Sequence, residues 1–161
     1  DVMVRADEFC AIPQAIGTVF VTENDINGLS FPRVKDAMIL FGRGYGFDFL
    51  LDAHWLQEKE IYYWGDIDTH GFAILSQFRE YFPRTHSFLM DCKVLHECRE
   101  SWSEEVEQFP GVPQRLNNDE LALFNAIKKD RYGKSIRLEQ ELIPFDLVEA
   151  ILEEIENLQL D

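Results

Sequence analysis

Two aspartates stand two residues apart directly after a short apolar stretch of the chain. Residues 61–64 run through Gly65 into Asp66 and Asp68, and a short apolar run bounded by glycine is typical of a central parallel strand. Strand side chains alternate between faces, so we expect both carboxylates to leave the strand end on the same side. Two such carboxylates repel each other and are costly to desolvate unless a cation shares their pocket, and a divalent metal is the simplest candidate.

A third acid, Glu23, follows another predicted strand. Residues 18–23 are β-branched and aromatic, which favours a strand, and turn-forming residues follow them. In open α/β sheets the carboxyl ends of parallel strands meet at one edge, where ligands bind. No cationic residue stands beside Glu23, Asp66 or Asp68 in the sequence. We therefore expect these three acids to form an oxygen-rich site suited to Mg²⁺ or Mn²⁺.

The elements around these acids alternate between strand and helix, as in a parallel α/β protein. The pattern predicts one domain with a lead-in over 1–17, an α/β core with the metal site over 18–91, and a mainly helical part over 92–161. Within it we expect further strands over 37–41 and 86–91, and helices over 47–56, 71–82, 119–131 and 145–158. Asn118 is the expected N-cap of the third helix, turn chemistry is expected after Glu23, and residues 136–143 are ambiguous.

Composition limits what the site can belong to. The chain has 161 residues, of which 46% are hydrophobic, and this suits one globular domain. No apolar run approaches the roughly 20 residues that span a bilayer, so we expect no membrane association. Three cysteines are too few and odd in number for a disulfide framework, which favours the cytoplasm. The first residue is Asp1, so we expect the chain to be the C-terminal fragment of a longer protein.

Charge argues against a simple DNA-binding surface. The net charge is −15, and such a surface repels nucleic acid at long range. Arg43 stands in a glycine-rich turn whose amides can hold a phosphate, although a tight turn explains the glycines as well. A run of basic residues is either a solvated helix end or a local phosphate site; it contains Lys128, Lys129, Arg131, Lys134 and Arg137.

Four further polar residues are candidate accessory groups. Asn24 and His70 flank the acids and are candidates to bind phosphate or orient ligands, although turn formation explains Asn24 and a structural role explains His70. Glu139 and Glu141 would share one strand face if their segment is extended. They would then either reach the metal cluster or pair with the nearby basic run.

Several motifs resemble known families. Glu23 together with Gly65-Asp66-x-Asp68 resembles the Toprim domain of topoisomerases, primases and some nucleases. Most of the chain is more closely similar to the C-terminal domain of the Wadjet protein JetD, and its ten-residue run from Tyr63 to Phe72 is the most specific element. The matching stretches are Val21-Thr-Glu-Asn24, Gly42-Arg-Gly-Tyr45, Tyr63-Trp-Gly-Asp-Ile-Asp-Thr-His-Gly-Phe72, Leu89-Met-Asp91 and Leu138-Glu-Gln-Glu141.

The resemblance implies both a fold and an activity. The fold is a Toprim-like, Rossmann-like α/β domain related to that of the topoisomerase VI A subunit, with a mainly parallel sheet flanked by helices. The activity is metal-dependent cleavage of plasmid DNA by a nuclease subunit of an SMC-like defence complex, a homodimer that binds DNA through a separate N-terminal region. Glu23, Asp66 and Asp68 map onto the catalytic metal-site acids, with water as the simpler nucleophile than a tyrosine from another domain.

Two other function classes compete with this interpretation. Haloacid-dehalogenase-like phosphohydrolases also end a strand in Asp-x-Asp, which would make Asp66 the nucleophile. Their Thr or Val stands two places beyond the second aspartate, however, whereas Thr69 follows Asp68 immediately. The third possibility is a non-catalytic module whose acidic C-terminal helix docks a basic protein.

Overall fold

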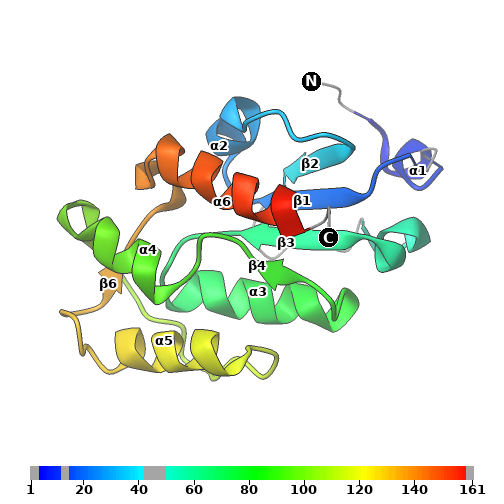
Figure 1. Cartoon of the computed structure of the whole chain (residues 1–161). Helices are drawn as coiled ribbons and strands as arrows, with labels where there is room; N and C mark the ends of the chain where they lie inside the picture. Colours follow the sequence, from blue (N-terminus) through cyan, green and yellow to red (C-terminus); the bar gives the residue numbers. More distant parts are fainter. Residues whose placement is uncertain (1–3, 12–14, 42–49, 159–161) are drawn as a thin grey trace.

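A parallel sheet of four strands lies at the centre of the molecule. The computed structural model describes residues 4–11, 15–41 and 50–158. Within them the sheet has the order β2-β1-β3-β4 (Figure 1). Its strands are β1 (Thr18–Thr22), β2 (Ala37–Phe41), β3 (Glu60–Trp64) and β4 (His86–Ser87). Thr22 pairs with Trp64, so β1 and β3 end side by side and the residues that follow them emerge at one edge.

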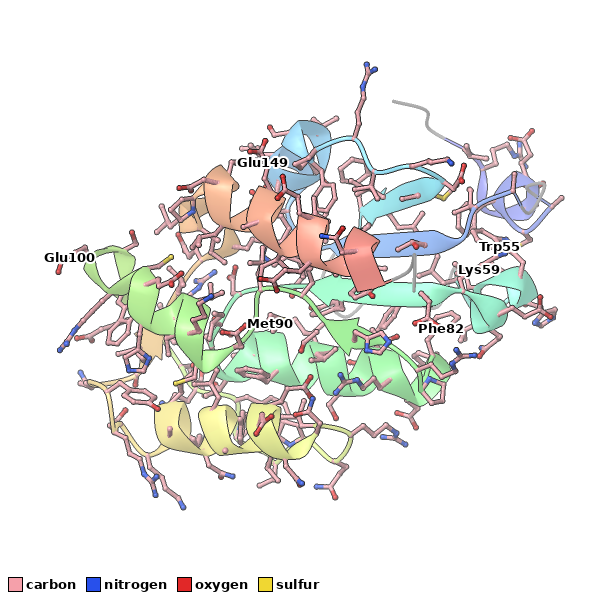
Figure 2. The ribbon with its side chains drawn as sticks, viewed as in Figure 1. Trp55, Lys59, Phe82, Met90, Glu100 and Glu149 are labelled. Atoms are coloured by element: carbon pink, nitrogen blue, oxygen red, sulfur yellow. The ribbon has the colours of Figure 1, made fainter. Side chains whose placement is uncertain are left out.

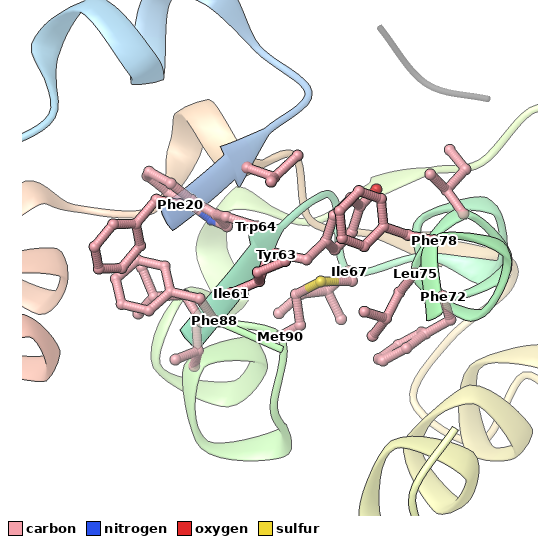
Figure 3. Close-up of a cluster of buried hydrophobic side chains, with 14 of the residues drawn as sticks. Phe20, Ile61, Tyr63, Trp64, Ile67, Phe72, Leu75, Phe78, Phe88 and Met90 are labelled. Carbon is pink, nitrogen blue, oxygen red and sulfur yellow. The ribbon is translucent and has the colours of Figure 1, made fainter. Parts of the chain in front are cut away.

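Aromatic residues fill the space on both faces of the sheet, as the alternation of strand side chains requires. Trp64, Phe20 and Phe88 lie together on one face (Figure 3), and the ring centroids of Trp64 and Phe88 are 5.7 Å apart. On the other face Tyr63 stacks on Phe78 of the neighbouring helix at 5.9 Å. All five side chains are almost fully buried, and burial of each contributes roughly 1.5–3 kcal/mol to stability. The strand that leads to the aspartates is therefore held firmly on both sides.

Helix α3 (Thr69–Tyr81) begins immediately after the aspartate pair. Its apolar residues Phe72, Leu75 and Phe78 recur at helical spacing and are fully buried, and the helix ends just before Pro83. Helix α5 (Asn118–Lys128) packs on its outer side, and α6 (Phe145–Leu158) lies across the other face of the sheet (Figures 1 and 3). The sheet is therefore covered by helices on both faces.

Short elements connect these layers. They are α1 (Ala6–Phe9), α2 (Asp25–Ser30), η2 (His54–Glu58), α4 (Cys92–Glu97), η3 (Arg99–Ser101), β5 (Ser103–Glu104), β6 (Ile136–Arg137) and η4 (Gln140–Leu142). Strands β5 and β6 form a separate antiparallel pair. Beyond β6, Leu138 and Ile67 exchange two backbone hydrogen bonds of 2.9 and 3.2 Å. The chain after α5 therefore returns to the loop that carries the aspartates.

The sheet end opposite the aspartates is closed by apolar side chains. Trp55 and Phe82 lie near the start of β3 (Figure 2) and are almost fully buried. The indole nitrogen of Trp55 donates to the carbonyl of Phe9 at 3.2 Å, which ties α1 to this end. In the described part of the chain, no helix has the length and apolar character needed to cross a membrane.

The structure confirms the predicted fold class, a mainly parallel sheet flanked by helices as in Toprim-like α/β domains. Strands β1, β2 and β3 and helices α3, α5 and α6 occur where the sequence predicted them. The predicted strand over 86–91 is wrong beyond Ser87, because Leu89 has a φ of 57°, which interrupts extended backbone.

Four local predictions are also corrected. Residues 25–30 form helix α2 instead of a simple turn. Asn117, not Asn118, caps α5, because its side chain accepts from the Glu120 amide while Glu120 accepts from the Asn117 amide. The expected extended lead-in contains the one-turn helix α1. Of the helix predicted over 47–56, the described part from residue 50 contains 3₁₀ conformation, including the start of η2, and no α-helix. Residues 47–49 and Arg43 lie outside the described residues.

Candidate functional site

The structure brings Glu23, Asp66 and Asp68 into one pocket. Glu23 follows β1 and the aspartates follow β3, and all three line a cavity of about 360 Å³ at the carboxyl ends of these strands. The Glu23 carboxylate lies against Gly65, where an added Cβ would stand 2.4 Å from Glu23 Oε1. The full lining consists of Glu23, Asp66, Asp68, His70, Gly71, Ile74, Glu105, Val106, Glu107 and Arg137.

Asp68 has a second task as the N-cap of α3. Its Oδ1 accepts a hydrogen bond of 2.7 Å from the Gly71 amide, and only 4% of the residue is exposed. Gly71 permits this tight start, because a Cβ there would lie 2.1 Å from the backbone oxygen of Asp66. The positive end of the helix dipole therefore faces the aspartate pair and favours its negative charge.

Arg137 supplies a positive charge inside the pocket. Its guanidinium forms an ion pair with Asp66 Oδ2, and its Nε is 3.2 Å from that oxygen and 3.3 Å from Asp68 Oδ2. Glu139 Oε1 lies 3.4 Å from Nη2 of the same guanidinium. The sequence prediction missed this contact because Arg137 is 71 positions from Asp66. It belongs to the basic run, and strand β6 turns it away from the rest of that run.

Gln140 is a further site residue that sequence reasoning missed. Its backbone amide donates to Asp66 Oδ1 at 2.9 Å, and only 2% of the residue is exposed. With the side-chain amide oriented to satisfy both its ends, the nitrogen lies 2.9 Å from Thr22 Oγ1 and 3.0 Å from the Trp64 carbonyl, while the oxygen accepts from the Asn24 amide. Gln140 thus joins the ends of β1 and β3 and fixes one oxygen of Asp66.

The acids on either side of Gln140 do not contact the aspartates directly. Glu139 faces Arg137, and Glu141 accepts a hydrogen bond from the side-chain nitrogen of Asn24. Asn24 also caps α2, with its Oδ1 2.7 Å from the Ile26 amide. Neither glutamate is among the pocket-lining residues. The segment is not extended throughout, because β6 gives way to the 3₁₀ turn η4.

Glu105 is a fourth carboxylate in the pocket and is 7% exposed. It accepts from the Thr69 hydroxyl at 2.7 Å and from the His70 amide at 3.1 Å, so it caps the first turn of α3 beside Asp68. His70 lines the pocket and packs edge-on against Phe109, with ring centroids 5.7 Å apart. The sequence offered no signal for Glu105, which stands in an acidic, irregular segment far from both strand ends.

Burial and mutual repulsion raise the pKa of two of these carboxyls. The pKa of Glu23 rises to about 7 because the group is desolvated, and Asp66 and Asp68 add to the shift, although the hydrogen bond from the Tyr63 hydroxyl opposes it. The pKa of Asp68 rises to about 6, again chiefly through desolvation, with Glu105 and Asp66 adding to it against the Gly71 amide. Burial in the pocket therefore favours the neutral form of both carboxyls.

Burial alone would lower the pKa of Arg137, but its hydrogen bond and attraction to Asp66 outweigh burial and raise it. The guanidinium is therefore fully charged at neutral pH. Among the described residues, no three His, Cys, Asp or Glu side chains stand ready to hold a metal ion. Arg137 instead engages the Oδ2 atoms of both aspartates.

The donor chemistry itself suits a hard divalent ion. Mg²⁺ and Mn²⁺ prefer carboxylate oxygens, and Glu23, Asp66 and Asp68 offer only these. Each aspartate has its Oδ1 tied to a backbone amide, of Gln140 or Gly71, and its Oδ2 turned toward a cation. A metal would therefore need Arg137 to move and would leave the Oδ1 contacts in place.

Four other described basic residues are predicted phosphate contacts, and none of them is among the residues that line the pocket: Lys128, Lys129, Arg131 and Lys134. The Lys128 ammonium donates to the carbonyl of Phe109, and Lys134 pairs with Glu104 at 3.6 Å. Lys129 and Arg131 are exposed. Of this run, Arg137 is the member that the structure brings to the acids.

A family model described as "Wadjet protein JetD, C-terminal" matches residues 1–152. The match confirms the resemblance seen in the sequence, and it includes both acid-bearing strand ends and the segment with Arg137 and Gln140. No curated protein matches the chain.

Proposed function

Because the chain belongs to the family of Wadjet JetD C-terminal domains, we propose that it is the Toprim-like nuclease domain of a Wadjet defence complex and cleaves DNA with a divalent metal. Membership of that family implies a role in Wadjet defence. The observation that carries the finer proposal is the meeting of Glu23, Asp66 and Asp68 in one pocket at the carboxyl ends of β1 and β3.

The residues have complementary roles in this reaction. A bound Mg²⁺ or Mn²⁺ would neutralise charge on the scissile phosphate and lower the pKa of an attacking water. Asp66 and Asp68 would hold the ion through their Oδ2 atoms, while the Gln140 and Gly71 amides keep the carboxylates oriented. This support resembles the outer-shell contacts that orient ligands in known metal sites.

Glu23 is suited to proton transfer as well as to metal binding. Its pKa of about 7 lies close to neutrality, which is where a general acid or base works best. Tyr63 holds one Glu23 oxygen by a hydrogen bond, so the carboxylate has a fixed direction. We propose that Glu23 accepts the proton of the attacking water or contacts the ion directly.

DNA binding would require the rest of the complex. The chain carries a net charge of −15, and the described residues that line the pocket supply five carboxylates and one guanidinium, that of Arg137. Long-range repulsion would therefore keep DNA away from this domain alone. The proposed partners are DNA, other subunits of the defence complex and a second copy of the full-length protein, which together would deliver the phosphate to the metal.

The phosphohydrolase alternative has weaker support. Phosphohydrolases of that class place Thr or Val two positions beyond the second aspartate, whereas here Thr69 follows Asp68 immediately. A covalent aspartyl-phosphate trapped on Asp66 would nevertheless establish that alternative over ours.

The test combines metal binding with DNA cleavage. Mn²⁺ is titrated into the wild-type chain and the Asp66→Asn and Glu23→Ala variants by calorimetry, and plasmid nicking is followed with the same substitutions in the full-length protein. We expect both variants to lose most metal binding and nicking. The control is Glu60→Gln, because Glu60 opens β3 at the opposite end of the sheet. Undiminished nicking by Glu23→Ala, or robust nicking in EDTA, would refute the proposal.

A further inference from the structure

The guanidinium of Arg137 occupies the side of the aspartate pair where a cation belongs. Among the described residues that line the pocket, Arg137 alone is a lysine or arginine. Its Nε lies 3.2 Å from Asp66 Oδ2 and 3.3 Å from Asp68 Oδ2, so it bridges the two carboxylates. These are also the oxygens left over once the backbone amides of Gln140 and Gly71 have taken the Oδ1 atoms.

We propose that Arg137 is an exchangeable counter-cation, which holds Asp66 and Asp68 in the metal-free protein and releases their Oδ2 atoms when a divalent ion binds. The inference rests on the metal site of the proposed function and adds a residue that acts on it. Arg137 is thus a positioning residue. Its positive charge offsets the repulsion between the two carboxylates, and its contacts direct their Oδ2 atoms toward the same point.

Competition follows from the shared oxygens. A divalent ion and a guanidinium on the same Oδ2 atom would stand within a few ångströms of each other, where two positive charges repel strongly in a partly buried pocket. The aspartates themselves need not move, since the Gln140 and Gly71 amides hold their other oxygens. The exchange therefore replaces one cation by another while the carboxylates keep their hydrogen bonds to the Gln140 and Gly71 amides.

The surroundings give the released guanidinium a place to go. Its side chain is 34% exposed, so it is not trapped by packing. Glu139 Oε1 already lies 3.4 Å from Nη2 and is itself 39% exposed. Arg137 can therefore keep one carboxylate partner at the pocket rim while it leaves Asp66 and Asp68, which avoids an unpaired charge in the released state.

The exchange predicts opposite effects on stability and on metal affinity. The Arg137→Met variant keeps an unbranched apolar side chain but removes the guanidinium and its charge, so we expect the metal-free chain to melt several degrees lower because the two aspartates then lack a counter-ion. Mn²⁺ affinity, measured by calorimetry, should rise about fivefold because the competitor is gone. The Arg137→Lys variant should fall between wild type and Arg137→Met in both measurements.

The matched control is Arg84→Met. Arg84 also pairs with a carboxylate, Glu60, at 2.8 Å, but it is 69% exposed and lies at the opposite end of β3. We expect this variant to change neither the melting temperature of the metal-free chain nor the Mn²⁺ affinity. An effect there equal to that of Arg137→Met would mean that general loss of positive charge is responsible, and would overturn the exchange.

A wild-type measurement makes the test independent of whether a variant folds. The Arg137 Nε–H signal, assigned in ¹⁵N-labelled chain, should shift when Mg²⁺ saturates the site, while the Arg84 signal stays in place. If the metal binds but the Arg137 signal does not move, or if Arg137→Met binds Mn²⁺ no more tightly than wild type, the exchange is wrong and the metal site of the proposed function stands. If neither protein binds metal, both proposals fail together.

Discussion

The hydroxyl of Tyr63 donates a hydrogen bond to Glu23 Oε1, so the acid after β1 is held by a residue inside the adjacent strand β3. Tyr63 is fully buried and also stacks on Phe78 of α3. A buried core residue therefore fixes the position of the Glu23 carboxylate. The same hydrogen bond lowers the pKa of Glu23, which burial raises.

Removing this hydroxyl should move the pH at which the site binds metal. In Tyr63→Phe the pKa of Glu23 rises above its present value of about 7, because the hydrogen bond to the charged form is lost. We expect the midpoint of Mn²⁺ affinity against pH to move up by about one pH unit, the equivalent of one ordinary hydrogen bond. The control is Tyr62→Phe, because Tyr62 lies on the opposite face and stacks on Phe20. An unchanged profile in Tyr63→Phe would exclude this role.

Stability without metal should fall as the pH rises. The pKa values of Glu23 and Asp68 are raised from 4.5 to about 7 and from 3.8 to about 6 in the folded chain. Their contribution is therefore fully present below pH 4 and is lost between about pH 4 and 7, by on the order of 2 kcal/mol per group.

Urea unfolding in EDTA across this pH range measures the loss. The decrease of the unfolding free energy with pH should be smaller in Glu23→Gln, which has no carboxyl to ionise at this position. It should be unchanged in the control Glu58→Gln, because Glu58 is exposed. Mn²⁺ should restore stability most strongly at the high end of the range, where the ligands are deprotonated. A rise in metal-free stability from Glu23 ionisation would contradict the assignment.

Two glycines should respond differently to a single added methyl group. Gly71→Ala would place a Cβ 2.1 Å from a backbone atom, the carbonyl oxygen of Asp66, so the start of α3 must shift and stability should fall by about 2 kcal/mol or more. Gly65→Ala would meet the side-chain oxygens of Glu23 and Tyr63 at 2.4 and 2.9 Å. We expect it to displace Glu23 and to weaken metal binding more than it lowers stability.

Thermal unfolding and Mn²⁺ calorimetry together separate these two outcomes. Gly17→Ala is the control, because its nearest neighbour would lie 3.9 Å away, which is ordinary contact. Equal metal affinity in Gly65→Ala and Gly17→Ala would show that the Glu23 carboxylate tolerates the shift.

The ion pair between Arg79 and Glu120 should matter for folding and not for metal. Arg79 Nη2 donates to Glu120 Oε1 at 2.8 Å, the two side chains are 10% and 4% exposed, and the pair joins α3 to α5. Arg79→Met leaves Glu120 buried without its partner, so we expect a loss of about 3 kcal/mol in unfolding free energy. Mn²⁺ affinity of the folded fraction should not change.

The pH dependence of this pair has the opposite sign to that of the pocket. Burial raises the pKa of Glu120, but the Arg79 and Asn117 hydrogen bonds outweigh it and leave the pKa below 4.5. Its contribution is therefore present above pH 4.5 and is lost as the pH falls through the lowered value. Arg79→Met should remove this acid-sensitive part of the dependence of stability on pH. Arg84→Met should not, because Arg84 belongs to a different, exposed ion pair with Glu60.

The sequence predicted those features that depend on local pattern. The β-branched run before Glu23 and the aromatic run before Asp66 each specify a strand, and the parallel pairing then places their ends together. The apolar spacing of Phe72, Leu75 and Phe78 likewise specifies α3. These signals are strong because burial of regular elements follows a fixed period.

The sequence could not predict the charges that meet across long distances. Arg137 in β6 and Glu105 in an irregular segment line the pocket, and Gln140 in η4 contacts Asp66. None of these segments has a distinctive period. The basic run predicts either a solvated helix end or a phosphate site, yet Arg137 turns inward against Asp66. The capping residue of α5 was also misplaced by one position, since neighbouring asparagines are equally good N-caps in isolation.

The two backbone hydrogen bonds between Leu138 and Ile67 have a practical consequence for the design of shorter versions of this protein. The central sheet and α3 are complete by residue 87, so a fragment ending near there would contain the whole sheet and both acid-bearing strand ends. It would nevertheless lack the guanidinium and the amide that balance Asp66. Any minimal fragment that is to keep this pocket has to extend past Leu142, the end of η4, because the contacts of Arg137 and Gln140 with Asp66 come from this late part of the chain.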